Sequence, residues 1–362
     1  MSEDVYDRLA SALDALPNAF PRTPGGSELQ ILRRIYSPDE AFVAAHLGRQ
    51  AEPLGLVAAR LGRPEKEVAA QLKAMAKKGQ LWPDFDRASG ERRYRLAPFV
   101  VGVYEASLEL LDHEFAHLVE RYFAEGGAAG IMAVGPALHR ALPAAGAVGE
   151  WVLPYDDIVR LIEQARTFRV EDCICRVEQA HVGNECRFPV HDCLRFFSGK
   201  RPPHPDDITK AEALAIVAEA ERLGLVHAVS NNIADVFYVC NCCGCCCALL
   251  RAVNEWGFAN AVARASYRVV VDAEACSGCG ICAERCQVKA VGVPDGLAVV
   301  DESRCLGCGA CVTGCTTGAL RLERLPGAET MRPPADFAAW EEERLRQRAL
   351  LEVEHEGQAH RH

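Results

Sequence analysis

The sequence predicts an α+β protein whose front part is mostly helical and whose back part is rich in cysteine. Three observations predict this fold class. Apolar residues recur at helical spacing in the front part, over 54–78 and again over 99–125. Two short runs, 267–272 and 297–301, have the composition of strands. All 18 cysteines lie within 173–315, so the metal-binding chemistry is expected in the second half of the chain.

The composition is that of a globular protein kept in a reducing compartment. The chain has 362 residues, of which 49% are hydrophobic and 25% charged, enough for more than one domain. Its start, MSEDVYDRLA, lacks the pattern of a signal peptide, and no apolar stretch reaches membrane-spanning length. We therefore expect a cytoplasmic protein with no membrane span, whose cysteines bind metal or clusters rather than form disulfides. The net charge of −10 disfavours non-specific binding to nucleic acid.

The first folded segment of the front part has basic character. Residues 54–78 read as helix, turn and helix, with Gly62 at the turn, and two short strands follow. This pattern resembles a winged helix over 49–95, where eleven Lys and Arg residues outnumber six Asp and Glu residues. DNA binding is one interpretation of that surplus. Protein docking is favoured over it, because Glu65 and Glu67 occupy the start of the helix that would enter a groove.

Three further segments are expected to be helical. The sequence HEFAH at 113–117 matches the H-E-x-x-H pattern of zinc proteases, but no third ligand is identifiable and a solvated helix explains it as well. Residues 155–169 are amphipathic and predict a helix that leads into Cys173. The charged tail from about residue 336 predicts a solvated or frayed helix.

The middle part holds ten cysteines in two groups. The first group lies within 173–193, and the second is the run CNCCGCCC at 240–247. A helix predicted over 209–224 would bring the second group back to the first. Neighbouring residues of an extended chain point to opposite sides, so Cys242 and Cys243 are not expected to serve one iron site.

We expect these ten cysteines to bind one or two iron–sulfur clusters, in addition to any bound by the eight cysteines nearer the C-terminus. Zinc is the alternative. The nine candidate ligands are Cys173, Cys175, Cys186, Cys193, Cys240, Cys242, Cys243, Cys246 and Cys247. Arg176, Arg187 and Arg195 would offset the negative charge of bound thiolates. His181 and His191 are further candidate ligands, although surface histidines are commoner than ligating ones. The spacing does not say which cysteine pairs with which.

An internal repeat near the C-terminus predicts its metal ligands more specifically than the spacing of the middle cysteines does. Residues 272–291 and 301–320 superpose after a shift of 29 residues, which brings Cys276 onto Cys305. Each copy has the spacing C-x-x-C-x-x-C-x-x-x-C, in which three cysteines of one copy and the fourth of the other hold one cubane cluster. The predicted ligand sets are Cys276, Cys279, Cys282 and Cys315 for one cluster, and Cys305, Cys308, Cys311 and Cys286 for the other. Two structural zinc sites would not need a third cysteine at this spacing.

Over 260–325 the repeat resembles the bacterial-type dicluster ferredoxins. The resemblance implies a β-α-β-β-α-β domain with two [4Fe–4S] clusters and a short helix after each loop. Gln287 and Thr316 depart from it, because a proline usually follows the fourth cysteine. Over 150–325 the whole arrangement resembles multi-domain 4Fe–4S dicluster-binding proteins, which implies electron transfer without naming a substrate.

These observations predict four regions and a redox function. The regions are a helical, winged-helix-like domain (1–125), a helical cysteine-rich region with a further cluster or metal site (126–259), a dicluster ferredoxin domain (260–325) and a charged helical tail (326–362). We expect electron transfer, as a relay or as a subunit docked on a redox partner or oxidoreductase complex. The alternatives are a cluster-dependent DNA-binding regulator and an oxidoreductase whose middle cluster has an open iron site. No catalytic residue is predicted, and no Gly-rich phosphate loop is visible.

Overall fold

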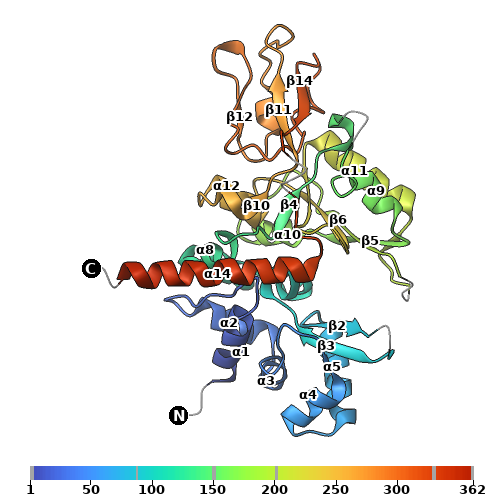
Figure 1. Ribbon diagram of the computed structural model, residues 1–362, viewed down its shortest axis with the longest axis vertical. Helices are drawn as coiled ribbons and strands as arrows, with labels where there is room; N and C mark the ends of the chain where they lie inside the picture. Colours follow the sequence, from blue (N-terminus) through green and yellow to red (C-terminus); the bar gives the residue numbers. More distant parts are fainter. Residues whose placement is uncertain (1–3, 87–88, 149–151, 200–202, 328–331, 360–362) are drawn as a thin grey trace. The chain divides into compact units, whose positions relative to one another are not determined.

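The computed structural model of the chain describes residues 4–86, 89–148, 152–199, 203–327 and 332–359. The chain forms two compact units, Met1–Ala133 with Glu352–His362, and Val134–Leu351 (Figure 1). Of the predicted tail, residues 328–331 and 360–362 lie outside the described residues. Helices and strands are mixed along the chain, which agrees with the predicted α+β class. The finer division into four regions stays a prediction.

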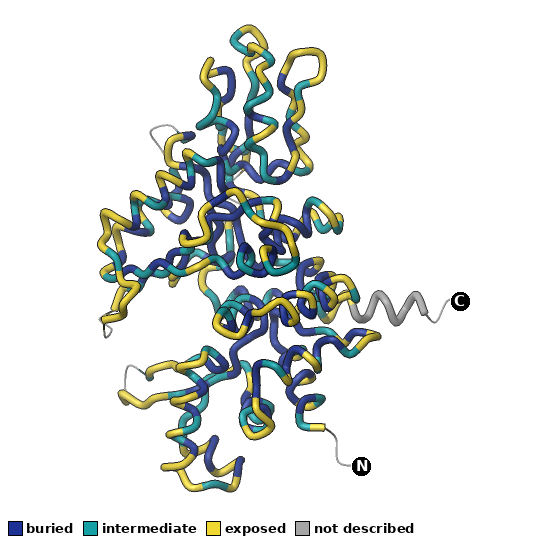
Figure 2. Tube along the Cα trace, turned by 180° about the vertical axis from the view of Figure 1, so that it is seen from behind, coloured by how far each residue is buried: buried dark blue, intermediate teal, exposed yellow. Residues whose placement is uncertain are grey.

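The first unit is mainly helical and has an aromatic core. Its helices are α1 (Val5–Asp14), α2 (Ser27–Ile35), α3 (Pro38–Ala44), α4 (Leu54–Leu61), α5 (Glu65–Lys77), α6 (Tyr104–Ala106), α7 (His113–Tyr122) and α8 (Ala128–Met132). The rings of Phe20, Phe99 and Tyr122 are buried and pack on one another, with centroids 4.7–5.8 Å apart. Buried and exposed residues alternate along these helices, as expected of amphipathic segments (Figure 2).

The predicted helix–turn–helix and the two strands after it are present. Gly62 ends α4 in the left-handed conformation, with φ of 63°, which glycine adopts without strain. The strands β1 (Glu52–Pro53), β2 (Leu81–Phe85) and β3 (Arg92–Leu96) form an antiparallel sheet in the order β1-β3-β2. Whether this segment acts as a winged helix stays a prediction.

A seven-stranded sheet forms the centre of the second unit. The strand order is β10-β4-β8-β9-β6-β5-β7, and every neighbouring pair is antiparallel except β10 and β4. The strands are β4 (His139–Ala141), β5 (Thr167–Asp172), β6 (His191–Phe197), β7 (Asp207–Ile208), β8 (Val226–Ser230), β9 (Tyr238–Cys242) and β10 (Val262–Ala263). The helices around the sheet are α9 (Ile158–Glu163), α10 (Ile174–His181), α11 (Lys210–Leu223) and α12 (Ala248–Asn254).

The prediction of a helical middle region over 126–259 is incomplete, because strands β4 to β9 lie in it beside helices α9 to α12. The helix expected over 155–169 ends at Glu163, and β5 rather than a helix leads into Cys173. The strand β8 is buried along its whole length, so it shows no alternation of polar and apolar residues. Short strands of this kind cannot be told from helix segments by periodicity.

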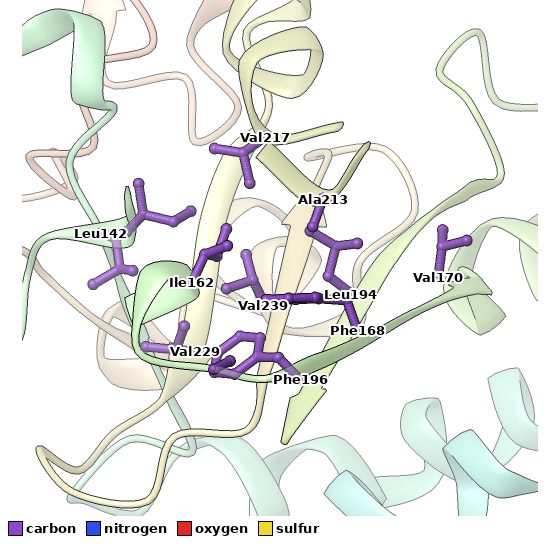
Figure 3. Packing of buried hydrophobic residues seen from close by; sticks show 12 residues of the cluster. Leu142, Ile162, Phe168, Val170, Leu194, Phe196, Ala213, Val217, Val229 and Val239 are labelled. Carbon is purple, nitrogen blue, oxygen red and sulfur yellow. The ribbon is translucent and has the colours of Figure 1, made fainter. Parts of the chain in front are cut away.

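The two faces of the sheet differ in chemistry. Helices α9 and α11 cover one face, where they pack on Phe168, Leu194 and Val239 (Figure 3). Side chains alternate along a strand, so the neighbours of these residues point to the opposite face. Cys193 of β6 and Cys240 of β9 are such neighbours. One face of the sheet therefore holds the core, and the other face presents cysteines.

The predicted helix between the two cysteine groups is confirmed as α11. The Thr209 hydroxyl accepts a hydrogen bond from the Glu212 N–H at 3.2 Å, and the Glu212 carboxylate accepts one from the Thr209 N–H at 2.7 Å. These reciprocal bonds form a capping box. Gly224 ends the helix with φ of 79°, as the sequence predicts.

The C-terminal repeat folds into two small antiparallel sheets. β11 (Tyr267–Val271) pairs with β14 (Leu320–Arg324), and β12 (Val291–Gly292) pairs with β13 (Val299–Val300). The first cysteine loop leads into α13 (Ile281–Arg285), whereas residues 310–314 of the second copy form turns. The helix that the resemblance implies for the second copy is therefore reduced to turns.

The prediction of a solvated tail is wrong for the start of α14 (Phe337–Ala359). Trp340 and Arg344 are buried. The Trp340 indole donates to the Ala137 carbonyl at 2.9 Å, and the Arg344 guanidinium donates to the carbonyls of Val134 and Pro136 at 2.6 Å each. Among the described residues, no helix combines the length and hydropathy needed to cross a bilayer.

Candidate metal centres

The four cysteines predicted for the first cluster line one cavity. They are Cys276, Cys279, Cys282 and Cys315. Gly278 in the loop has φ of 68°, and a Cβ there would overlap the carbonyl oxygen of Gly296, so the turn requires glycine. Partial burial opposes ionisation of Cys315, but hydrogen bonds from the Thr317 hydroxyl and from backbone N–H groups hold its pKa below the usual value. The loop thus presents its sulfurs to a common space.

The four cysteines predicted for the second cluster also converge. Cys286 lies within electrostatic reach of all three sulfurs of the second loop, which are Cys305, Cys308 and Cys311. The Gly307 N–H donates to the Cys305 sulfur at 3.4 Å, and the Ala290 N–H donates to the Cys286 sulfur at 3.1 Å. Burial raises the pKa of Cys308 to about 12. Such buried sulfurs become thiolates only when a cationic group compensates their charge.

Comparison with known proteins identifies this repeat. Residues 269–291 and 298–321 match the family model of the 4Fe-4S binding domain. Residues 269–321 form a 4Fe–4S binding domain. The matched segments contain all eight predicted ligands, and their thiolates with N–H···S bonds suit such clusters. No curated protein and no solved structure matches the chain.

Six of the ten middle cysteines form a closed ring of sulfurs, here called the six-cysteine ring. In order around the ring they are Cys173, Cys175, Cys247, Cys242, Cys240 and Cys193, each within electrostatic reach of its two neighbours. They come from the start of α10, the start of α12 and the cysteine-bearing face of β6 and β9. No three of these described sulfurs lie within 4.8 Å of one another, so the six sulfurs together are spread too widely for one ion, although Cys173, Cys193 and the Asp192 carboxylate lie within that distance of one another.

The six-cysteine ring alternates in its affinity for protons. Interactions with neighbouring thiols lower the pKa of Cys173, Cys240 and Cys247 well below the usual value, and the same interactions raise the pKa of the three sulfurs between them. A buried guanidinium balances this negative charge. Burial opposes the charge of Arg176, but the Cys173 thiolate and Asp192, 2.5 Å away, raise its pKa.

A residue that sequence analysis missed, His139, lies beside the six-cysteine ring. Its imidazole is 5% exposed, and neither nitrogen has a hydrogen-bond partner. It stands on β4 and is within electrostatic reach of Cys240 and Cys247. A buried imidazole without hydrogen-bond partners is costly. No local pattern marks it, because only strand pairing brings it to the cysteines.

The other four middle cysteines form a compact group, which is Cys186, Cys243, Cys245 and Cys246. The Cys186 sulfur lies 3.7 Å from the sulfurs of Cys243 and Cys245, and the sulfurs of Cys245 and Cys246 are 3.6 Å apart. Cys245 is not among the nine predicted ligands. Cys242 and Cys243 belong to different groups, as the alternation of side chains along a strand predicts.

A glutamine connects the compact group to the C-terminal repeat. The Gly244 N–H donates to the Gln287 side-chain oxygen at 2.8 Å, and the Gln287 amide donates to the Gly224 carbonyl at 2.9 Å. A Cβ on Gly244 would overlap the Gln287 carbonyl oxygen, so the two backbones are in close contact. Gln287 follows Cys286, where a proline is usual. A proline side chain could make neither hydrogen bond.

The predicted histidine ligands stay outside these groups. Among the described residues, no candidate metal group contains His181 or His191, and His191 is exposed. Of the HEFAH segment, His113, Glu114 and His117 lie on the exposed side of α7, and Glu114 is paired with Arg34 at 3.1 Å. His113 and His117 lie one turn apart on this solvated surface. The solvated-helix interpretation therefore suffices for the motif.

The two other predicted arginines have different surroundings. Arg187 lies over the Phe188 ring, 5.0 Å from its centroid. Arg195 is paired with Glu171 at 2.9 Å and is within electrostatic reach of Cys240. Arg176 is thus the most buried positive charge among the three, and Arg195 is a weaker, partly exposed contributor.

Proposed function

We propose that the protein transfers electrons through two [4Fe–4S] clusters bound by its C-terminal repeat. The observation that carries the proposal is the convergence of two four-cysteine sets within a 4Fe–4S binding domain. The proposed ligands are Cys276, Cys279, Cys282 and Cys315 for one cluster, and Cys305, Cys308, Cys311 and Cys286 for the other. A bound cluster of this type accepts and releases one electron at a time.

Groups of the chain that surround the two proposed clusters would adjust their reduction potentials. Backbone N–H groups of Ala290 and Gly307 donate to ligand sulfurs, which stabilises negative charge on them. Cys282 of the first set and Cys311 of the second are within electrostatic reach of each other. The two ligand sets therefore adjoin, which suits electron transfer from one to the other.

The six-cysteine ring is proposed to bind a third iron–sulfur cluster. The ring is closed but wider than a single-ion site, so several metal atoms are needed to use all six thiolates. Arg176 offsets the charge of the ring, and the buried His139 imidazole, whose nitrogens have no hydrogen-bond partner, lies within electrostatic reach of it. This cluster would extend the relay into the middle of the second unit.

The winged-helix-like segment 49–95 is proposed to dock on a redox partner or oxidoreductase complex. Part of its positive charge is already neutralised, because Arg60 donates to Glu52 at 2.8 Å and Arg63 donates to Asp39 at 2.6 Å. A DNA-binding surface would leave such arginines free for phosphates. Binding to DNA fragments with a steep salt dependence would reverse this assignment.

Iron and acid-labile sulfide analysis with EPR, on anaerobically purified full-length protein, tests the function. We expect more than about eight irons per chain with matching sulfide, and cubane signals after reduction. About eight irons would retain the two C-terminal clusters and reject the cluster at the six-cysteine ring. Protein without iron or sulfide would contradict electron transfer altogether.

A further inference from the structure

The compact group of Cys186, Cys243, Cys245 and Cys246 has the dimensions of a single-ion site. In a tetrahedron with metal–sulfur bonds of about 2.3 Å, neighbouring sulfurs lie about 3.8 Å apart. The sulfur–sulfur distances here are 3.7, 3.7 and 3.6 Å, and all four sulfurs lie within 4.8 Å of one another. Sulfurs that bind different irons of a cubane lie farther apart. We propose that these four cysteines bind one zinc ion, separate from the iron–sulfur clusters.

The other cysteines of the chain serve as an internal reference. Among the described residues, no three sulfurs of the C-terminal repeat or of the six-cysteine ring lie within 4.8 Å of one another. The C-terminal set belongs to a domain family that binds 4Fe–4S clusters. Among the described residues, the compact group is thus the one set that brings more than two sulfurs within 4.8 Å of one another.

The donor set suits zinc in particular. Four thiolates complete a tetrahedral shell, which is the usual arrangement of structural zinc and leaves no open position for a substrate. Cys243 and Cys246 are each 1% exposed, whereas Cys245 is exposed. Zinc with four thiolates has a net charge of about −2. The Arg176 side chain donates a hydrogen bond to the Cys243 sulfur and so offsets part of that charge.

The site would join two distant parts of the second unit. Cys186 lies in the loop after α10, and its partner Cys243 lies 57 residues later, in the turn between β9 and α12. That turn also contains Gly244, whose N–H is bonded to Gln287. The zinc ion would therefore fix the position of the turn over 243–246, which contacts Gln287 through Gly244. Because zinc has no redox chemistry, this role is positioning rather than electron transfer.

Metal analysis of the full-length protein and of matched variants tests the proposal. Zinc, iron and sulfide are measured in the same anaerobic samples, and one zinc per chain is expected in the wild type. Cys245→Ala and Cys186→Ala should lose the zinc and keep their iron and sulfide. The control is Cys279→Ala, because Cys279 is exposed like Cys245. It should lose iron and keep the zinc.

A second measurement needs no variant and so does not depend on folding. X-ray absorption at the zinc edge of the wild type should give four sulfur neighbours at about 2.3 Å and no metal neighbour. Wild-type protein without zinc, or a Cys245→Ala variant that loses iron and sulfide together, would overturn the proposal. A single iron in place of zinc would overturn it as well. None of these results contradicts the two C-terminal clusters, which are tested separately by the iron and sulfide content of the protein.

Discussion

The C-terminal repeat and the compact group of Cys186, Cys243, Cys245 and Cys246 both gather cysteines in fours, but at different spacings. In the repeat, two residues separate successive loop cysteines, and the sulfurs line a cavity. In the compact group, three of the four cysteines occur within four residues of one turn, and the sulfurs lie 3.6–3.7 Å apart. Under the two proposals, the spacing of the cysteines along the chain distinguishes a cluster site from a single-ion site.

The two regions also differ in which groups compensate the negative charge of their sulfurs. In the repeat, backbone N–H groups such as that of Gly307 donate to the ligands, an arrangement that adjusts a redox potential. In the compact group, the Arg176 guanidinium donates to Cys243 and supplies a whole positive charge. The two regions therefore compensate the charge of their sulfurs by different groups, backbone N–H dipoles in the repeat and a guanidinium in the compact group.

The largest expected effect comes from removing a buried ligand of the repeat. Cys311 is 6% exposed and belongs to the second predicted set. Cys311→Ala should lose about four irons with their sulfide and keep its zinc, because the second cluster loses a ligand while the compact group is unchanged. Iron and zinc analysis of the purified variant measures this. Loss of zinc together with iron would mean that the two regions are not independent.

The next effect concerns the contact between the two regions. Gly244→Ala places a Cβ onto the Gln287 carbonyl oxygen, so the turn must move, and we expect a loss of about 1–3 kcal/mol in the free energy of unfolding. Denaturant unfolding of the cluster-loaded protein measures it. The control is Gly199→Ala, where a Cβ meets nothing within 4 Å. Equal stabilities of the two variants would argue against the contact.

A smaller effect is expected for the side chain of the same contact. Gln287→Ala removes hydrogen bonds to Gly244 and Gly224, which should cost about 1–3 kcal/mol if the partners stay buried. Thr316→Ala is the matched control, because Thr316 is exposed and holds the equivalent position in the second copy. We expect the control to change the free energy of unfolding by less than about 0.5 kcal/mol. A larger loss of stability in Thr316→Ala would mean that the contact of Gln287 with Gly244 and Gly224 does not set Gln287 apart from its counterpart in the second copy.

The smallest effect separates the scaffold from the metal sites. Thr209→Ala removes the cap of α11 and should cost about 1 kcal/mol without changing iron or zinc content. Hydrogen bonds from the Thr209 backbone and hydroxyl lower the pKa of Glu212, so this capping contribution exists above the ordinary glutamate pKa and is lost as the pH falls through the lowered one. The difference in the free energy of unfolding between wild type and Thr209→Ala should therefore narrow as the pH falls from neutral to acidic. A constant difference would argue against the capping box.

The parts of the molecule that sequence predicted well are those determined locally. The C-terminal repeat is read from spacing alone, because its ligands are separated by short loops whose glycines set the turns. The helix α11 is read from its periodicity, its Thr209 cap and Gly224. The separation of Cys242 from Cys243 follows from side-chain alternation in a strand.

The parts that sequence did not predict depend on strand pairing. The six-cysteine ring requires β6 beside β9, and His139 reaches it only because β4 lies in the same sheet. Cys245 joins the compact group through a partner 59 residues earlier in the chain. The sheet itself was missed because its strands are short and β8 is buried throughout, although β5 and β6 do alternate between buried and more exposed residues. Gln287 reads as a departure from a family pattern, and only its contact with Gly244 supplies a reason.

Native mass spectrometry of the anaerobically purified full-length chain is the most direct test of the contrast between the two regions. The account predicts one intact species whose added mass contains two [4Fe–4S] clusters, one zinc ion and the further iron–sulfur cluster of the six-cysteine ring. A species that contains only iron and sulfide, with no zinc, would contradict the claim that ligand spacing separates a single-ion site from the clusters.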